Sequence, residues 1–297
     1  MTGHLRIKSP NTQLGILLLV YFVPQLLIVA ASQAFLAGKL DFSNIENIAT
    51  LKWIQAISSI VFFFLPAILY ALFSFRGKYF YFLGFKNPER SSMYVLGIGC
   101  MLLAFPVVFW LGDINQHIPL PAYMVEMEKQ AAKQMEAFLK ISGPADLFIN
   151  IIIIALLPAI CEEMFFRGAM QRVIIHLTRR PWIGIIITAA LFSALHFQFQ
   201  GFLPRMFLGV VLGALYWFSG SIWTSIVAHF ITNAIQVIAA SYATKYINEN
   251  PSIPVYLAIP SAIAVFGILR LYQRMSTITW SKVYDRDGLT PHNNFIA

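Results

Sequence analysis

The sequence is poor in charge and in cysteine. Only 11% of its 297 residues are charged, whereas a soluble domain normally holds about 25%, and this excludes an ordinary soluble protein. Its two cysteines give no C-x-x-C motif and no disulfide framework. The 21 basic residues outnumber the 13 acidic ones, but they lie scattered at the ends of apolar runs. This placement indicates charges that face the anionic inner leaflet of a membrane, and no nucleic-acid partner is expected.

Long apolar runs make up most of the chain, since 58% of its residues are hydrophobic. Runs of about 17–25 apolar residues are long enough to span a bilayer. The sequence therefore predicts an all-α integral membrane protein with about eight transmembrane helices. The predicted spans are Leu14–Ala37, Leu51–Phe75, Met93–Gly112, Ala145–His176, Trp182–Phe197, Leu203–Ser219, Ser221–Tyr242 and Ile253–Tyr272.

Charge counting predicts the orientation of these spans. With both termini in the cytoplasm, the inner segments hold 13 basic residues and the outer segments seven, as the positive-inside rule requires. In the polar insert at 119–143, methionines and other apolar residues recur at helical spacing, opposite a face of charged residues. This pattern predicts an amphipathic helix on the outer surface. The tail from Ser276 to Ala297 is polar and is expected to be poorly ordered.

Three of the predicted spans carry groups that are costly in lipid. By insertion scales a charged side chain at the centre of a span costs about 2.5–3.5 kcal/mol, so packing or chemistry must offset it. The groups are Glu162, Glu163 and Arg167 in the fourth span, His196 in the fifth, and His229 and Asn233 in the seventh.

Spacing and depth suggest that these groups meet. Glu163 and Arg167 lie four residues apart and can pair along one helix face, whereas Glu162 lies about 100° round the helix and needs another partner. At about 1.5 Å per residue, four groups fall at overlapping distances from the predicted inner ends of their helices: Glu162, His196, His229 and Asn233. The sixth span carries a G-x-x-x-G pair, Gly209 and Gly213, that allows close helix packing beside them.

Carboxylate, imidazole and amide groups together are suited to hydrolysis. A desolvated glutamate is a workable base for water, and imidazole and amide N–H groups can stabilise an oxyanion. The alternative for the whole set is a buried structural hydrogen-bond network. For Glu163 and Arg167 the structural interpretation is preferred, because their ion pair neutralises two buried charges; for Glu162, His196, His229 and Asn233 the functional one is preferred.

The same residues resemble the motifs of a known family. "EEMFFR" is similar to an E-E-x-x-x-R signature, "FSALH" to F-x-x-x-H and "HFITN" to H-x-x-x-N, in the same order and in separate spans. These are motifs of the CPBP family (CAAX prenyl endopeptidases and bacteriocin-processing enzymes, also called Abi). The resemblance covers about Ala145 to Ile238. It divides the chain into N-terminal helices and a surface helix at 1–144, a catalytic core at 145–242, and a last helix and tail at 243–297.

The resemblance implies an intramembrane catalytic chamber that hydrolyses peptide bonds of a membrane-associated protein or peptide in a bacterial plasma membrane. Glu162 would then be the general base, helped by His196, while His229 and Asn233 would stabilise the oxyanion. Glu163 and Arg167 match positions that orient the site.

Two alternatives stay open at this point. No cofactor is expected, because the chain lacks the H-E-x-x-H motif of zincins, but Glu162, His196 and His229 could instead supply three zinc ligands of a metalloprotease. The second alternative is a non-catalytic membrane protein, such as a bacteriocin-immunity factor or a scaffold, that keeps the motifs for structure.

Overall fold

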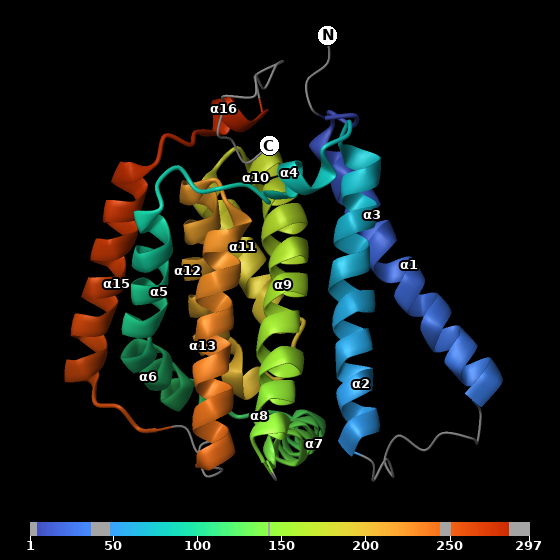
Figure 1. Cartoon of the computed structure of the whole chain (residues 1–297), viewed down its shortest axis with the longest axis vertical. Coiled ribbons are helices and arrows are strands. Elements are labelled where there is room, and N and C mark those ends of the chain that lie inside the picture. The colour runs from blue at the N-terminus through green and yellow to red at the C-terminus, as the bar shows by residue number, and fades with distance from the viewer. Residues whose placement is uncertain (1–4, 37–47, 142, 244–250, 285–297) are drawn as a thin grey trace.

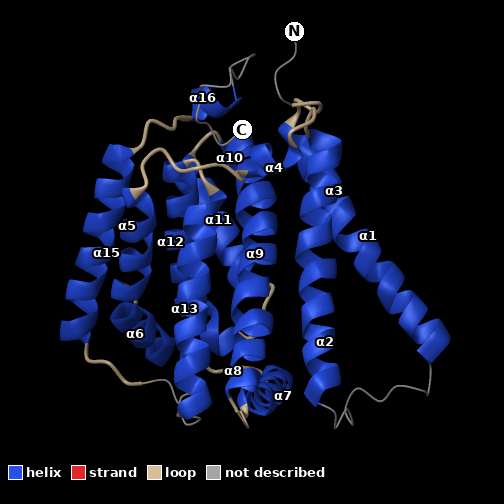
Figure 2. Cartoon of the chain, in the orientation of Figure 1, coloured by secondary structure: helices blue, strands red, loops and turns tan. Residues whose placement is uncertain are grey.

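The computed structural model describes residues 5–36, 48–141, 143–243 and 251–284. Within these ranges the chain is built of helices and contains no strand (Figure 2). The prediction of an all-α membrane protein is confirmed. Seven described helices, close to the predicted eight, are long and apolar enough to cross a membrane. They are Pro10–Ile28, Ile48–Ser74, Ser92–Gln116, Pro144–Thr178, Phe199–Ser219, Ile222–Tyr242 and Val255–Met275.

The predicted fifth span is shorter than expected. Helix α11 covers Pro181–Ala194 and has 14 residues, so it is about 21 Å long and falls short of a bilayer core of about 30 Å. The chain leaves the helix at Leu195 and His196, and Phe197 takes a positive φ of 54°. His196 therefore lies in the turn that follows α11, beyond the helix that was predicted to carry it.

Prolines break several of the other spans into shorter helical pieces. The second span consists of α2 (Ile48–Ser59), a π-helical turn η2 (Ile60–Phe64) and α3 (Leu65–Ser74). Pro66 stands in the first turn of α3. Because proline lacks an N–H and crowds the carbonyl four residues earlier, the helix widens just before it. The third span likewise divides into α5 (Ser92–Leu103) and α6 (Phe105–Gln116), with a proline in the first turn of α6.

The long fourth span has the most irregular backbone. It consists of α8 (Pro144–Asn150), η3 (Ile151–Leu156), α9 (Leu157–Glu163), η4 (Met164–Gln171) and α10 (Arg172–Thr178). The N–H of Leu157 donates to the carbonyl of Ile152, five residues back, just before Pro158. Every residue of η4 is buried. The π-helical segment η4 therefore runs through the centre of the molecule.

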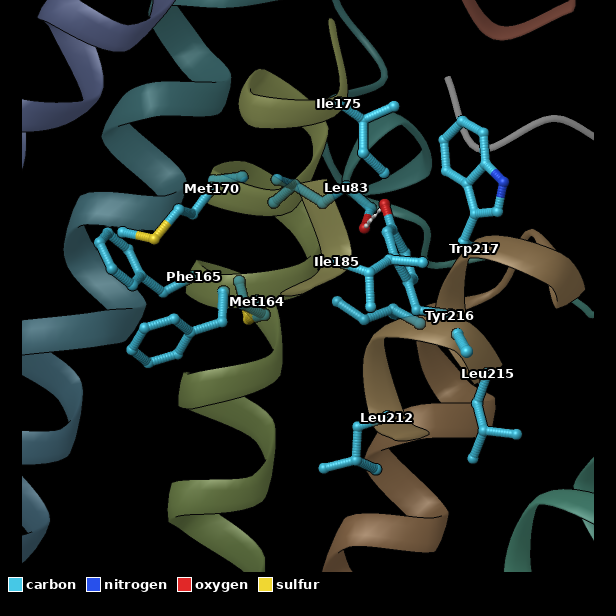
Figure 3. Close-up of a cluster of buried hydrophobic side chains, with 14 of the residues drawn as sticks. Leu83, Met164, Phe165, Met170, Ile175, Ile185, Leu212, Leu215, Tyr216 and Trp217 are labelled. Atoms are coloured by element: carbon cyan, nitrogen blue, oxygen red, sulfur yellow. Dashed lines mark hydrogen bonds between the residues drawn. The ribbon is translucent and has the colours of Figure 1, made fainter. Parts of the chain in front are cut away.

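The remaining helices surround this central one (Figure 1). Helix α1 (Pro10–Leu36) leans away from the rest, whereas α12 (Phe202–Ser219), α13 (Ile222–Tyr242) and α15 (Val255–Met275) complete the bundle. Side chains from the short helix α4 (Tyr79–Leu83) and from η4, α10, α11 and α12 belong to one apolar cluster (Figure 3). Within it the Tyr216 hydroxyl donates to the Leu83 carbonyl.

The predicted amphipathic helix is present as α7 (Ala122–Leu139). It lies across one end of the bundle (Figure 1). Buried Asn150 of α8 donates from Nδ2 to the Phe138 carbonyl at 2.8 Å and so holds the end of α7. The side of the membrane on which α7 lies stays a prediction.

The described part of the polar tail is ordered, contrary to expectation. Helix α16 (Trp280–Tyr284) packs on α10 at the end of the bundle where α1 begins (Figure 1). Trp280 Nε1 donates to the Ile175 carbonyl at 3.2 Å, and the Tyr284 hydroxyl donates to the Arg172 carbonyl at 2.7 Å. Trp280 and Tyr284 thus anchor this part of the tail, although most of the tail is polar.

Candidate active site

The candidate site is centred on the junction of α9 and η4. Glu162 and Glu163 are the last residues of α9, and Arg167 lies in η4. Glu163 is 0% exposed, Arg167 1% and Glu162 9%. Charges buried to this degree destabilise the fold unless they are paired or hydrogen-bonded, so the partners of each group indicate its role.

Glu163 has two close partners, both at its Oε1 atom. Arg167 Nη1 lies 3.0 Å from this oxygen, which is the predicted i,i+4 ion pair, and His229 Nδ1 donates to it at 2.9 Å. Arg167 also donates from Nη2 to the Gly209 carbonyl of α12 at 3.3 Å. One carboxylate thus joins the central helix to α13 directly and to α12 through Arg167.

His229 lies between the two glutamates. A carboxylate oxygen accepts hydrogen bonds, so Nδ1 of His229 carries the proton in its contact with Glu163. The other ring nitrogen, Nε2, lies 4.0 Å from Glu162 Oε2. Nε2 can accept a proton in the neutral ring and can donate one when the ring is protonated. The contact with Glu163 was absent from the sequence prediction, which assigned His229 to the oxyanion alone.

His196 approaches from the turn after α11. Its Nδ1 lies 2.7 Å from the Phe192 carbonyl, and because a carbonyl only accepts, Nδ1 is the protonated nitrogen and Nε2 is left available. The predicted i,i+4 relation between Phe192 and His196 is therefore present as a backbone contact that fixes the imidazole.

Phe192 brings the three motifs together. The centroid of its ring lies 4.9 Å from the ring centroid of His196 and 6.1 Å from that of His229. The Arg167 guanidinium carbon lies 4.7 Å from the Phe192 centroid. Three groups from three different elements thus contact a single aromatic side chain.

Asn233 lies one helical turn beyond His229 on α13 and is half-buried. Within the described part of the chain its amide makes no hydrogen bond. The amide is thus available to a ligand.

The zinc alternative requires three ligands close together. In the described ranges no three His, Cys, Asp or Glu side chains form a group that could hold a metal ion. Glu162 and His229 approach each other, but with His196 they do not form the three-ligand set that catalytic zinc requires.

One further charged group lies beside the loop that follows His196. Arg205 is one of the seven basic residues that the charge count assigns to the outer segments, and it is half-buried near the start of α12. The available sequence signal for this group was its position inside an apolar run, because an intramembrane arginine is by default a candidate functional group.

Comparison with known proteins gives a match over this part of the chain. Residues 144–235 match the family model described as type II CAAX prenyl endopeptidase Rce1-like. The chain is also 32% identical over 90 residues to the uncharacterized protein YpbD of Bacillus subtilis (strain 168). That alignment covers 29% of this chain and 43% of the relative. No solved structure matches the chain.

The match to the family model contains all six residues assigned from the motifs, from Glu162 to Asn233. Residues 144–235 of this multi-pass membrane protein are thus similar to the Rce1-like type of CAAX prenyl endopeptidase domain.

Proposed function

We propose that this protein is an intramembrane endopeptidase in which Glu162 activates water for attack on a peptide bond. The observation that carries the proposal is the difference between the two glutamates. Glu163 has two close partners, whereas Glu162 has no hydrogen bond in the described part of the chain and no ion-pair contact shorter than 4.0 Å. A buried carboxylate without a hydrogen bond does not stabilise the fold, and it is available as a base.

The proposed reaction begins when Glu162 takes a proton from water as the water oxygen attacks the scissile carbonyl. The free Nε2 of His196 assists by accepting a hydrogen bond from the same water. The carbonyl oxygen becomes an oxyanion, and the Asn233 amide donates to it, joined by Nε2 of His229 when that ring carries a second proton. Glu162 then returns the proton to the leaving amine, the C–N bond breaks, and the products are a carboxylic acid and an amine.

Glu163 and Arg167 support this reaction without contacting the substrate. Glu163 fixes Nδ1 of His229 as a donor and orients the ring, as the aspartate of a serine-protease triad orients its histidine. Arg167 balances the charge of Glu163, so that the pair can stay buried.

Membrane-proteome analysis tests the activity. Membranes from cells with the wild-type protein and from cells with Glu162→Gln are compared for new protein termini, and candidate peptides are then assayed with purified protein in proteoliposomes. We expect termini that depend on Glu162 and lie near predicted membrane segments. Identical termini in both membranes, together with no turnover in proteoliposomes, would support the non-catalytic interpretation.

We also propose that both termini are cytoplasmic and that α7 lies on the outer side of a bacterial plasma membrane. The first described residues pair with the end of α3, where the Arg6 N–H donates to the Ser74 carbonyl at 2.8 Å, and α16 lies at the same end of the bundle. Gln130 on α7 is exposed, so Gln130→Cys should react with an impermeant thiol reagent from outside intact cells. Labelling only after the cytoplasm is opened would reverse the topology.

A further inference from the structure

The loop that follows His196 is held from several sides. Residues 197–201 connect α11 to α12 and contain the short 3-10 turn η5 (Phe199–Gly201). Phe197 takes a left-handed backbone conformation that non-glycine residues rarely adopt. Such a conformation persists only where the surrounding structure fixes it, so the contacts of this loop are informative.

Arg205 of α12 holds the start of the loop. Its Nη1 donates to Gln198 Oε1 at 2.9 Å, and its Nη2 donates to the Gln198 carbonyl. The guanidinium also lies against Gly201, where a Cβ would come within 2.9 Å of Arg205 Cζ. The described part of the chain places no carboxylate within 4.0 Å of Arg205, so its close contacts are with this loop.

Asn115 of α6 holds the end of the loop. It is 3% exposed, and its Nδ2 donates to the Phe199 carbonyl at 2.8 Å while its Oδ1 accepts from the Leu203 N–H at 2.6 Å. The Asn115 side chain thus donates a hydrogen bond at the start of η5 and accepts another just after η5 ends. An aspartate would keep the acceptor and lose the donor.

Glu128 joins the loop to the helix that lies across the end of the bundle. Its Oε1 accepts from the Gln200 N–H at 3.0 Å. Helix α7 therefore contacts the segment that follows His196, 72 residues away in the chain.

We infer that Asn115, Glu128 and Arg205 are positioning residues that hold His196 in place by clamping the loop at residues 197–201. The inference rests on the proposed function only where it concerns turnover. The backbone of His196 leads directly into the clamped segment, and its ring is fixed to the Phe192 carbonyl on the other side. A misplacement of about 1 Å in such a group can lower a reaction rate about 100-fold.

Turnover measurements on variants test the effect on the reaction. Asn115→Asp and Glu128→Ala should lower kcat about 10- to 100-fold and leave KM unchanged, because none of these side chains is assigned to the substrate. Glu128→Gln retains an acceptor oxygen, so its kcat should lie close to that of the wild type. Glu126→Gln is the matched control, since Glu126 lies on the same helix, is exposed, and accepts from Gln130 on that helix; its turnover should equal that of the wild type.

Two measurements test the clamp itself, and neither depends on catalytic activity. Hydrogen exchange at residues 195–203 should accelerate in Asn115→Asp and Arg205→Ala, and the ¹⁵N signals of the His196 ring should shift. Both should stay unchanged in Glu126→Gln. Unchanged exchange and unchanged His196 signals in the first two variants would overturn the inference, whether or not the protein is a peptidase.

The outcomes separate the two proposals. If the wild-type protein shows no turnover, the proposed function fails, and the exchange and ¹⁵N results alone decide the clamp. If the wild-type protein turns over and the variants loosen the loop without lowering kcat, the positioning role is overturned and the peptidase assignment stands.

Discussion

Helix α9 carries a buried carboxylate on each of two sides, and the two carboxylates differ in how many partners they have. On one side, Glu163 is 0% exposed and shares one oxygen between Arg167 and His229. About 100° round the helix, Glu162 is 9% exposed, and its nearest opposite group in an ion-pair contact is the other ring nitrogen of the same histidine, His229 Nε2, at 4.0 Å. The first side is built for stability. The second leaves a carboxylate free, as a group that acts on a substrate requires.

The largest effect on stability is expected on the first side. Glu163→Gln leaves Arg167 buried without its counter-charge, and breaking such a pair typically costs about 3–5 kcal/mol. The variant should show a lower yield and a lower melting temperature in detergent. Adding Arg167→Gln to this variant removes the uncompensated charge and should recover part of the loss.

A melting temperature for Glu163→Gln equal to that of the wild type would remove the contrast between the two sides. It would mean that the Arg167 contacts with the Gly209 carbonyl and the Phe192 ring suffice to hold the cation.

A smaller effect is expected where α12 meets α11. A Cβ on Gly209 would lie 3.0 Å from the Cβ of Ala189 and 3.2 Å from its Cα, so Gly209→Ala must push the two helices apart. Overpacking of this kind costs about 1–3 kcal/mol. It should also weaken the Arg167 contact, because Gly209 supplies the carbonyl acceptor.

Gly267→Ala on α15 is the matched control for Gly209→Ala. A Cβ there meets nothing within 4 Å, and alanine is favoured over glycine inside a helix by about 0.5–1 kcal/mol. Thermal unfolding should show a loss for the first variant and a small gain for the second. A gain in both would show that the helices can separate freely at Gly209.

A still smaller effect is expected away from both sides, where α16 meets α10. Tyr284→Phe removes the hydrogen bond to the Arg172 carbonyl, and a hydrogen bond of this kind contributes about 0.5–1.5 kcal/mol. Turnover per folded molecule should not change. Tyr256→Phe serves as the control, because Tyr256 is 70% exposed; equal melting temperatures for the two variants would show that the α16 contact adds no stability.

No effect is expected from metal removal. If Glu162 and His196 activate water directly, the purified protein should keep its turnover after chelation and dialysis. Stoichiometric zinc in active protein, with activity lost on chelation and restored by zinc, would establish the metalloprotease alternative instead.

The sequence predicted the elements of the site better than the contacts between them. The Glu163–Arg167 pair was predictable because both residues lie on one helix at fixed spacing. The contact between His229 and Glu163 was not, because it depends on how α13 is rotated against α9. The π-helical segments that flank α9 also change the register that a regular helix would give.

The surroundings of His196 show the same limit. The motif around Phe192 and His196 was recognised, but the end of α11 at Ala194 was missed, because the apolar run continues past it. What ends the helix is a turn fixed by side chains from α6, α7 and α12. Contacts at this distance in the chain leave no periodic signal in one sequence.

The most direct test of the account measures thermal unfolding and turnover for Glu162→Gln and Glu163→Gln side by side. Glu162→Gln should melt at or above the wild-type temperature, because a buried carboxylate without a hydrogen bond is gone, and its turnover should fall by at least about 100-fold. Glu163→Gln should melt at a lower temperature. Equal losses of stability in both variants, with activity that follows the folded fraction, would contradict the assignment of chemistry to Glu162.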